Sequence, residues 1–229
     1  MHIGRNNPKT LYHINSIPLE RSECEKDVGV WISETLKPEE QCKKAAWTAN
    51  KVLGLMCRSV LYRDKKIWPK LYMTYVRPYL EYAVPAWSPW LEKDIAIIEK
   101  VQERALKQIP SLNHLNYSDK LKALGMTSLR ARRIKSDLCQ VWKILHNHDD
   151  VEETTWFTRA QEASQRQTRQ NSSVHNLVEP KAIRDVRRNF FSNRVVKPWN
   201  NLPEHIKSAK TITAFKRLYD KHVSNNTEE

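Results

Sequence analysis

The stretch KDIAIIEKVQERALKQIP, from Lys93 to Pro110, decides the class of this fold. Proline has no backbone N–H and cannot continue a helix, so Pro110 marks an end. Before it, apolar residues recur every three or four positions, which is the period of one helix face: Ile95, Ile98, Val101, Ala105 and Ile109. We therefore predict an amphipathic helix over residues 93–109 that packs this stripe against other helices.

The same period predicts two long helices elsewhere in the chain. Residues 38–59 begin with a proline, which suits a first helical turn, and one face of this helix gathers Cys42, Ala45, Ala49, Val52, Leu53 and Met56. Residues 128–146 form the other, with inward side chains at Leu129, Ile134, Leu138, Val141, Trp142 and Leu145. Both apolar faces need a partner, so we expect a helical bundle.

Turn and capping residues predict two further helices. The one over residues 63–82 begins near a capping Asp64 and carries Pro69 in its first turn, and Pro78 is expected to kink or end it. A short helix over residues 118–124 is predicted with Ser118 as its cap and Gly125 at its end.

The first 35 residues are predicted to be β-structure. HIG, TLYHI and DVGVWIS are short segments rich in β-branched or aromatic residues. A two-stranded piece is marginally stable alone, so this small sheet must pack on the helices. The predicted fold is mainly α, with a small N-terminal β-hairpin or sheet.

A change of composition divides the rest of the chain. Residues 147–180 are acidic and then polar, and we interpret them as a flexible linker between a helical domain at 36–146 and a C-terminal region at 181–229. The last helix of that region is predicted to start at a capping Thr211 and to carry Phe215, Leu218 and Tyr219.

The chain is strongly basic. Its 229 residues carry a formal net charge of +13, which favours a polyanionic partner, above all nucleic acid. The four cysteines include no C-x-x-C pair, so we expect reduced thiols. No apolar run approaches the roughly 20 residues that span a bilayer, and the N-terminus resembles no signal peptide. We expect an intracellular protein, nuclear or cytoplasmic, with no membrane partner.

No self-contained active site is visible in the sequence. Two-metal polymerase chemistry needs paired carboxylates, and the single Asp-Asp pair, Asp149-Asp150, lacks the aromatic residue and the strand that would precede it. A solvated acidic loop at a helix end is the simpler interpretation of the residues there that could bind a metal: His146, His148, Asp149, Asp150, Glu152 and Glu153. We therefore predict no catalytic residue, no bound metal and no cofactor.

Two basic clusters are the candidate binding residues. Arg130, Arg132, Arg133 and Lys135 fall within two turns of one predicted helix. Residues 181–221 hold eleven Lys or Arg against three Asp or Glu, and Arg187, Arg188 and Arg194 lie among aromatic residues. Cations among rings suit phosphate contact with base stacking. Alternatively, a small core forms there and the arginines are its wet surface; its members would be Phe190, Phe191, Val195 and Trp199.

One segment carries a family resemblance. YVRPYLEYAVPAWSPW, residues 75–90, resembles the L-V-R-P-x-L-E-Y-x-x-x-x-W-x-P pattern found after the palm in reverse transcriptases of non-LTR (LINE-type) retrotransposons, especially the Jockey-like and chicken-repeat-like groups. The flanks agree in order: MHIGRNN, EKDVGVWIS, LEKDIAIIEKVQERALKQI, YSDKLKALGMTSLRARRIKSDLCQVWKIL and FFSNRVVKPWNNLPEHIKSAKTITAFKRLYD resemble successive motifs of that family. The chain departs from the pattern at Val28, Glu103 and Lys120.

The resemblance implies a C-terminal fragment of an RNA-directed DNA polymerase. Residues 1–35 would be the end of the palm, and the helices a thumb that holds template and primer. The fingers and the metal-binding aspartates would lie upstream of Met1, so the fragment alone would lack polymerase activity, and Mg²⁺ would belong to the missing palm. Lys26, Gly29 and Val30 match the primer-grip strand, where a glycine lets another backbone approach closely.

The implied partners are RNA or an RNA–DNA duplex, together with the missing fingers and palm. Lys43 and Lys44 join the residues expected to contact phosphates on the thumb. In this frame Arg77 and Glu81 pair on a helix opened by Pro78, and the expected core rings are Tyr75, Tyr79, Tyr82 and Trp87. Two alternatives remain open: an element-derived helical module that binds a protein, and a relic without function.

Overall fold

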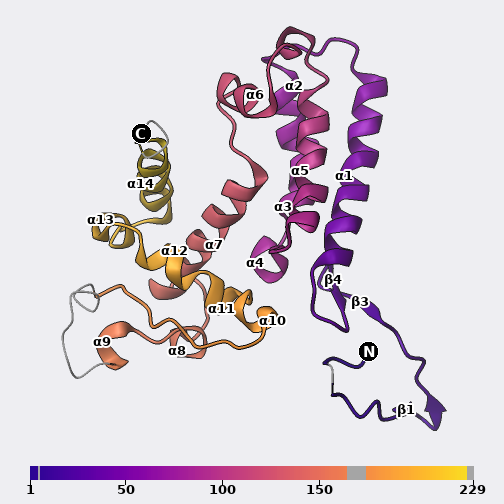
Figure 1. Cartoon of the computed structure of the whole chain (residues 1–229), viewed down its shortest axis with the longest axis vertical. Coiled ribbons are helices and arrows are strands. Elements are labelled where there is room, and N and C mark those ends of the chain that lie inside the picture. Colours follow the sequence, from indigo (N-terminus) through magenta and orange to yellow (C-terminus); the bar gives the residue numbers. More distant parts are fainter. Residues whose placement is uncertain (5, 164–173, 226–229) are drawn as a thin grey trace. The chain divides into compact units, whose positions relative to one another are not determined.

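The computed structural model describes residues 1–4, 6–163 and 174–225 of the chain. The fold is mainly helical with short antiparallel hairpins near the N-terminus (Figure 1), as predicted. It divides into two compact units, Met1–Ala131 and Arg132–Glu229, and each unit has its own hydrophobic core. The division falls inside helix α7 (Leu129–Leu145), ahead of the boundary that composition suggested at residue 146.

The first unit begins with two hairpins: β1 (His13–Ile14) pairs with β2 (Ile17–Pro18), and β3 (Cys24–Asp27) pairs with β4 (Val30–Ser33). Residues 2–4 form no strand, contrary to prediction. DVGVWIS is not one strand either, because Val28 and Gly29 are the two turn residues between β3 and β4, with φ of 42° and 86°. A tight hairpin turn needs positive φ at both central residues, and only glycine adopts it without a steric cost.

Helices α1 (Glu39–Ser59) and α5 (Glu92–Leu106) form the centre of the first unit. The two helices run parallel, as two side-chain hydrogen bonds between them show. Lys93 donates to Glu39 near the start of both helices (2.7 Å), and Arg104 donates to Asn50 about eleven residues further along both (2.8 Å). The predicted stripe of the 93–109 helix is buried throughout. The long-helix predictions are therefore confirmed, and α5 ends at Leu106 ahead of Pro110.

A broken helical segment covers the core between them: α2 (Trp68–Leu71), the π-helix η1 (Tyr72–Val76), α3 (Arg77–Glu81) and α4 (Val84–Trp87). The π-helical turn ends at Val76, two residues before Pro78, whose ring would clash with the carbonyl four residues earlier in a regular helix. The predicted break at Pro78 thus takes the form of one widened turn. Arg77 and Glu81 form the predicted ion pair, with Arg77 Nε 3.7 Å from Glu81 Oε2.

The aromatic residues of this segment divide differently from the prediction. Trp87 is buried and its indole N–H donates to the carbonyl oxygen of Tyr82 (2.7 Å). Tyr75, Tyr79 and Tyr82 are 56%, 46% and 52% exposed, so the expectation that they are core rings is wrong. Leu80 and Val76 fill the core positions instead, because they face α1 from the other side of the segment.

The remaining elements of the first unit are the 3₁₀ turn η2 (Pro110–Leu112) and helix α6 (Tyr117–Ala123). The cap of α6 is Asn116, whose side-chain oxygen accepts from the Asp119 amide (2.9 Å), and not Ser118 as predicted. Gly125 follows the helix with a φ of 60°, in the predicted role of a C-terminal glycine.

The second unit packs short helices around α7 and the C-terminal helix: α8 (Glu153–Trp156), α9 (Ala160–Ala163), α10 (Asp185–Arg188), α11 (Phe191–Arg194), α12 (Val196–Asn200), α13 (Glu204–Lys207) and α14 (Ile212–Asn225). Trp142, Trp199 and Phe215 lie in its core. The Thr211 hydroxyl accepts from the Ala214 amide (3.1 Å), which confirms the predicted cap of α14. Ile134, predicted to point inward, is 42% exposed.

The described ends of the expected linker belong to this second core. Phe157 and Leu177 are 5% and 2% exposed and pack with the core residues, and Arg159 forms a β-bridge with Leu177. The chain next to the bridge is therefore packed through Phe157 and Leu177, which differs from the flexible linker that composition suggested for these residues. The middle of the expected linker, residues 164–173, lies outside the described residues.

Candidate nucleic-acid interface

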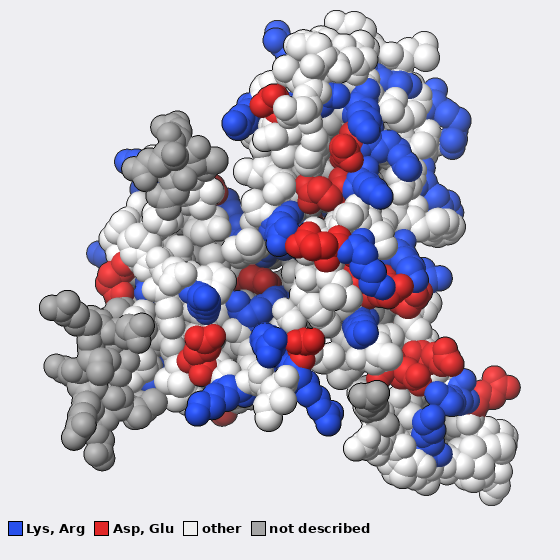
Figure 2. All heavy atoms as spheres, in the orientation of Figure 1, with Lys and Arg blue, Asp and Glu red and all other residues white. Residues whose placement is uncertain are grey.

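The outward face of α1 carries three cations and one exposed tryptophan. Lys44, Trp47, Lys51 and Arg58 recur at spacings of three, four and seven residues, which aligns them along one side of the helix. Trp47 is 62% exposed, and the Lys51 ammonium lies 4.3 Å from the centroid of its ring. At 1.5 Å per residue this face extends over about 21 Å. Figure 2 shows Lys and Arg side chains over the α1 region.

The β3–β4 hairpin extends this face beyond the start of α1. Lys26 and Trp31 are directly opposite each other in the hairpin, so their side chains lie on the same face. The Lys44 ammonium lies 5.2 Å from the centroid of the Trp31 ring. Two of the residues predicted to bind nucleic acid, Lys26 and Lys44, are thereby brought together. We call this surface the α1 basic face: Lys26, Trp31, Lys44, Trp47, Lys51 and Arg58.

The cations of the α1 basic face are not neutralised within the described part of the chain, where no carboxylate lies within ion-pair distance of any of the four. The neighbouring Lys43 differs, because it pairs with Glu39 and Glu40, each at 2.9 Å. Hydrogen bonds from Lys43 and Lys93 lower the pKa of Glu39 to about 2. Lys43 was a predicted contact, but much of its charge is already compensated.

Gly29 and Val30 differ in exposure, because Gly29 lies in the hairpin turn and Val30 packs into the first core. Val30 is 8% exposed and belongs to the first core, so the expectation of direct contact with nucleic acid is wrong for it. A Cβ on Gly29 would lie 3.0 Å from Tyr82 Cε1. The close approach predicted at this glycine exists, but it is made by the chain's own tyrosine.

The basic residues of the cluster on α7 differ in their contacts and in their exposure. Arg130 pairs with Glu92 at 3.0 Å within the first unit, and Lys135 pairs with Asp220 at 2.6 Å within the second. Arg133 is 4% exposed, which contradicts the expectation that it contacts a phosphate. Arg132 is half-buried. Spacing in sequence placed these residues close together, but burial and pairing leave little free positive charge there.

The C-terminal cluster divides in the same way. Arg194 donates two hydrogen bonds to the Asp137 carboxylate, both 2.9 Å, and their side chains are 16% and 9% exposed, so Arg194 acts as a structural residue. Arg188 pairs with Asp185 on the surface (3.0 Å). Arg187 is exposed and lies 5.4 Å from the Phe190 ring. Of the three predicted contacts, Arg187 therefore offers the most accessible charge.

The alternative small core is confirmed for three of its four members. Phe191, Val195 and Trp199 are 5%, 1% and 0% exposed, whereas Phe190 is 43% exposed. The loop with the candidate metal ligands is held by ordinary polar contacts: Asp149 accepts from Gln140 (2.7 Å) and lies 3.6 Å from Lys143. Across residues 1–4, 6–163 and 174–225, no three His, Cys, Asp or Glu side chains are grouped to hold a metal ion.

The half-buried Trp31 and the exposed Trp47 were not identified from the sequence as members of this face. A helical signal for Trp47 was present, since it falls opposite the apolar positions Cys42, Ala45 and Ala49 of the same helix. Helix periodicity could therefore have identified Trp47 as an outward residue. Trp31 could not be placed, because its exposure depends on how the hairpin packs on α1.

No helix in the described part of the chain has the length and apolar content needed to cross a membrane. Scans against protein-family models, curated proteins and solved structures find no match to this chain.

Proposed function

We propose that this chain binds RNA or an RNA–DNA duplex through its phosphates, without sequence specificity, and that the α1 basic face is the principal contact surface. The observation that carries the proposal is the row of four cations, unneutralised among the described residues, along the hairpin and about 21 Å of α1. Cations contact phosphates without distinguishing bases, which gives binding that is independent of sequence.

The family resemblance supports a role for this surface as part of a larger enzyme. As the C-terminal part of a non-LTR retrotransposon reverse transcriptase, the first unit would act as the thumb and hold the template–primer duplex. The chain would bind nucleic acid and would depend on an upstream palm for two-metal chemistry. We place this activity inside the cell, in the nucleus or the cytoplasm.

The test is binding of the full chain to a labelled RNA–DNA duplex across a salt series. The variant Lys44→Gln/Lys51→Gln/Arg58→Gln is compared with Lys65→Gln/Lys66→Gln/Lys122→Gln, which removes the same charge from exposed positions elsewhere in the first unit. Each phosphate contact contributes about 0.9 to the salt slope. The first variant should lower the slope by up to about 2.7, and the control should lower it much less. Two duplexes of unrelated sequence should bind alike.

Equal losses in the two variants would show that overall charge, not this surface, governs binding. No binding of the folded wild-type chain at low salt would contradict the proposal as a whole.

A second candidate function rests on a different observation. Tyr75, Tyr79 and Tyr82 project from one exposed segment of the first unit, and tyrosine is typical of protein interfaces. A helical protein-interaction module would use these rings, and its binding would depend only weakly on salt. Tyr75→Ala/Tyr79→Ala would then abolish partner binding and leave the duplex salt slope unchanged.

A further inference from the structure

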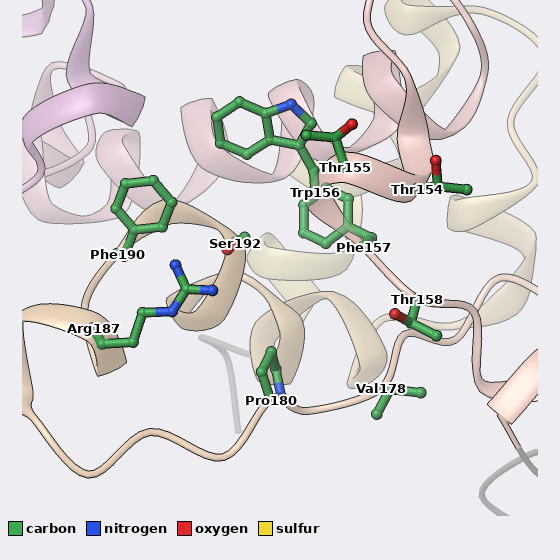
Figure 3. A pocket seen from close by; sticks show the side chains of 10 residues that line it. All are labelled: Thr154, Thr155, Trp156, Phe157, Thr158, Val178, Pro180, Arg187, Phe190 and Ser192. Carbon is green, nitrogen blue, oxygen red and sulfur yellow. The ribbon is translucent and has the colours of Figure 1, made fainter.

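The second unit contains a cavity of about 440 Å³ between α8 and the segment that leads from Val178 into α11. Figure 3 shows its lining, with Trp156 and Phe190 on one side and Arg187 reaching toward them. This volume is in the range of small-ligand sites. The cavity belongs to the second unit alone, whereas the α1 basic face belongs to the first.

Two rings of the cavity share an orientation. The planes of Trp156 and Phe190 differ by 7°, and their centroids are 6.2 Å apart. That separation exceeds the 3.5–4.0 Å of direct contact between stacked planes, so the rings are displaced sideways, as Figure 3 shows. The core residue Phe191 also packs against Trp156, with ring centroids 5.9 Å apart and ring planes at 76° to each other. A planar ligand group can therefore lie against a prearranged aromatic surface.

A cation stands beside this surface. The Arg187 guanidinium lies 5.4 Å from the Phe190 centroid, and within the described residues no carboxylate pairs with it. Its neighbour Arg188 is engaged by Asp185 at 3.0 Å. The adjacent threonine hydroxyls at Thr154, Thr155 and Thr158 are exposed at the cavity wall and can donate or accept hydrogen bonds. The cavity thus combines an aromatic surface, one accessible positive charge and hydroxyl groups.

We infer that this cavity holds one nucleotide of a single strand, with its base against Trp156 and Phe190 and its phosphate on Arg187. A planar base fits against the parallel rings. A phosphate would pair with the positive charge of Arg187, whereas an apolar or cationic ligand would leave that charge unpaired. The inference rests on the proposed nucleic-acid binding and deepens it: the α1 basic face takes the duplex, and this cavity takes an unpaired base.

The experiment uses the full chain and labelled six-nucleotide strands, as RNA and as DNA of one sequence. Each is compared with an abasic strand of equal length and charge, which separates base stacking from phosphate contact. Stacking on one ring pair should make the base-containing strand bind about tenfold more tightly. Phe190→Leu, which keeps apolar bulk on a half-exposed position, should remove that preference. Arg187→Gln should weaken both strands, and the control Arg188→Gln should leave both unchanged.

Equal affinity of the wild-type chain for base-containing and abasic strands would overturn the inference. A preference that survives Phe190→Leu would overturn it too, since another ring would then be responsible. The inference would also be overturned if an acidic peptide displaced the strand from the chain and if the Phe190→Leu variant bound that peptide more weakly than the wild-type chain does. Binding of the duplex distinguishes the two proposals. If the duplex binds with a normal salt slope but the single strand shows no base preference, only the proposal for the cavity is rejected. If the single strand shows a base preference but the duplex does not bind, only the proposal for the α1 basic face is rejected.

Discussion

The phenolic hydroxyl of Tyr82 donates a hydrogen bond to the backbone carbonyl of Val28, at 3.0 Å. This contact joins the segment after α3 to the tip of the β3–β4 hairpin, which is 54 residues away in sequence. The ring of Tyr82 also lies where a side chain on Gly29 would have to go. The hairpin, which carries Lys26 and Trp31 of the α1 basic face, is therefore fixed to the helices at its turn.

Gly29→Ala should destabilise the first unit by about 1–2 kcal/mol from the left-handed backbone alone, with a further loss from the contact with Tyr82. Gly125→Ala is the matched control, because Gly125 also has positive φ but a Cβ added there would meet no atom within 4 Å. Urea unfolding of both variants measures the difference. Equal costs at the two glycines would show that Tyr82 yields freely and does not fix the turn.

Trp142→Ala should cost about 3–5 kcal/mol of unfolding free energy, the usual loss for a buried aromatic residue. Trp142 is 3% exposed, and its indole N–H donates to the Ala209 carbonyl (3.2 Å). Trp47→Ala should change stability little, because that ring is 62% exposed. Thermal melts of the two variants test the contrast. A similar loss at Trp47 would mean that the α1 basic face is packed, not free for a ligand.

Arg194→Ala should destabilise the second unit by about 3 kcal/mol, because it leaves Asp137 buried without the two hydrogen bonds that Arg194 donates. Burial raises the pKa of the Asp137 carboxyl even beside Arg194. The cost of the variant should therefore shrink at acid pH, where Asp137 becomes neutral. Arg188→Ala removes an exposed pair and should cost less than about 1 kcal/mol. A pH-independent loss in Arg194→Ala would contradict this account.

Asp94→Asn should stabilise the first unit at neutral pH. Asp94 is fully buried at the start of α5, and neither of its carboxylate oxygens accepts a hydrogen bond from the described residues. Burial raises its pKa above the ordinary 3.8. The folded state then binds the proton more tightly than the unfolded state, so stability falls as pH rises from 3.8 through the raised pKa.

The gain from Asp94→Asn should accordingly be about 1–2 kcal/mol at pH 7 and disappear below pH 3.8. Glu92→Gln, in the same helical turn, is the control and should give no gain, because Glu92 is exposed and pairs with Arg130. A loss of stability in Asp94→Asn at pH 7 would show that the helix N-terminus stabilises the charge more than burial penalises it.

Much of the fold followed from local patterns. The stripe of α5, the face of α1 and the cap at Thr211 depend on spacings within one helix, so they could be predicted without the tertiary structure. The break at Pro78 was also predicted, since proline alone imposes it. The turn at Val28 and Gly29 was missed, because the β-branched residues around it favour an unbroken strand.

The candidate site followed less well from the sequence, because a charge can serve several purposes. Arg187, Arg188 and Arg194 look equivalent in sequence, but one lines a cavity, one pairs on the surface and one pairs with a buried aspartate. The partners Asp185 and Asp137 decide these roles, and Asp137 is 57 residues away from Arg194.

The sequence by itself determined that this chain is mainly helical and strongly basic. Those properties depend on composition and on contacts within a helix or between neighbouring residues. Only the tertiary structure decided which rings and cations remain accessible, as at Trp47 and Tyr75 compared with Trp87. Exposure depends on which distant segment covers a side chain, and no local period in the sequence contains that information.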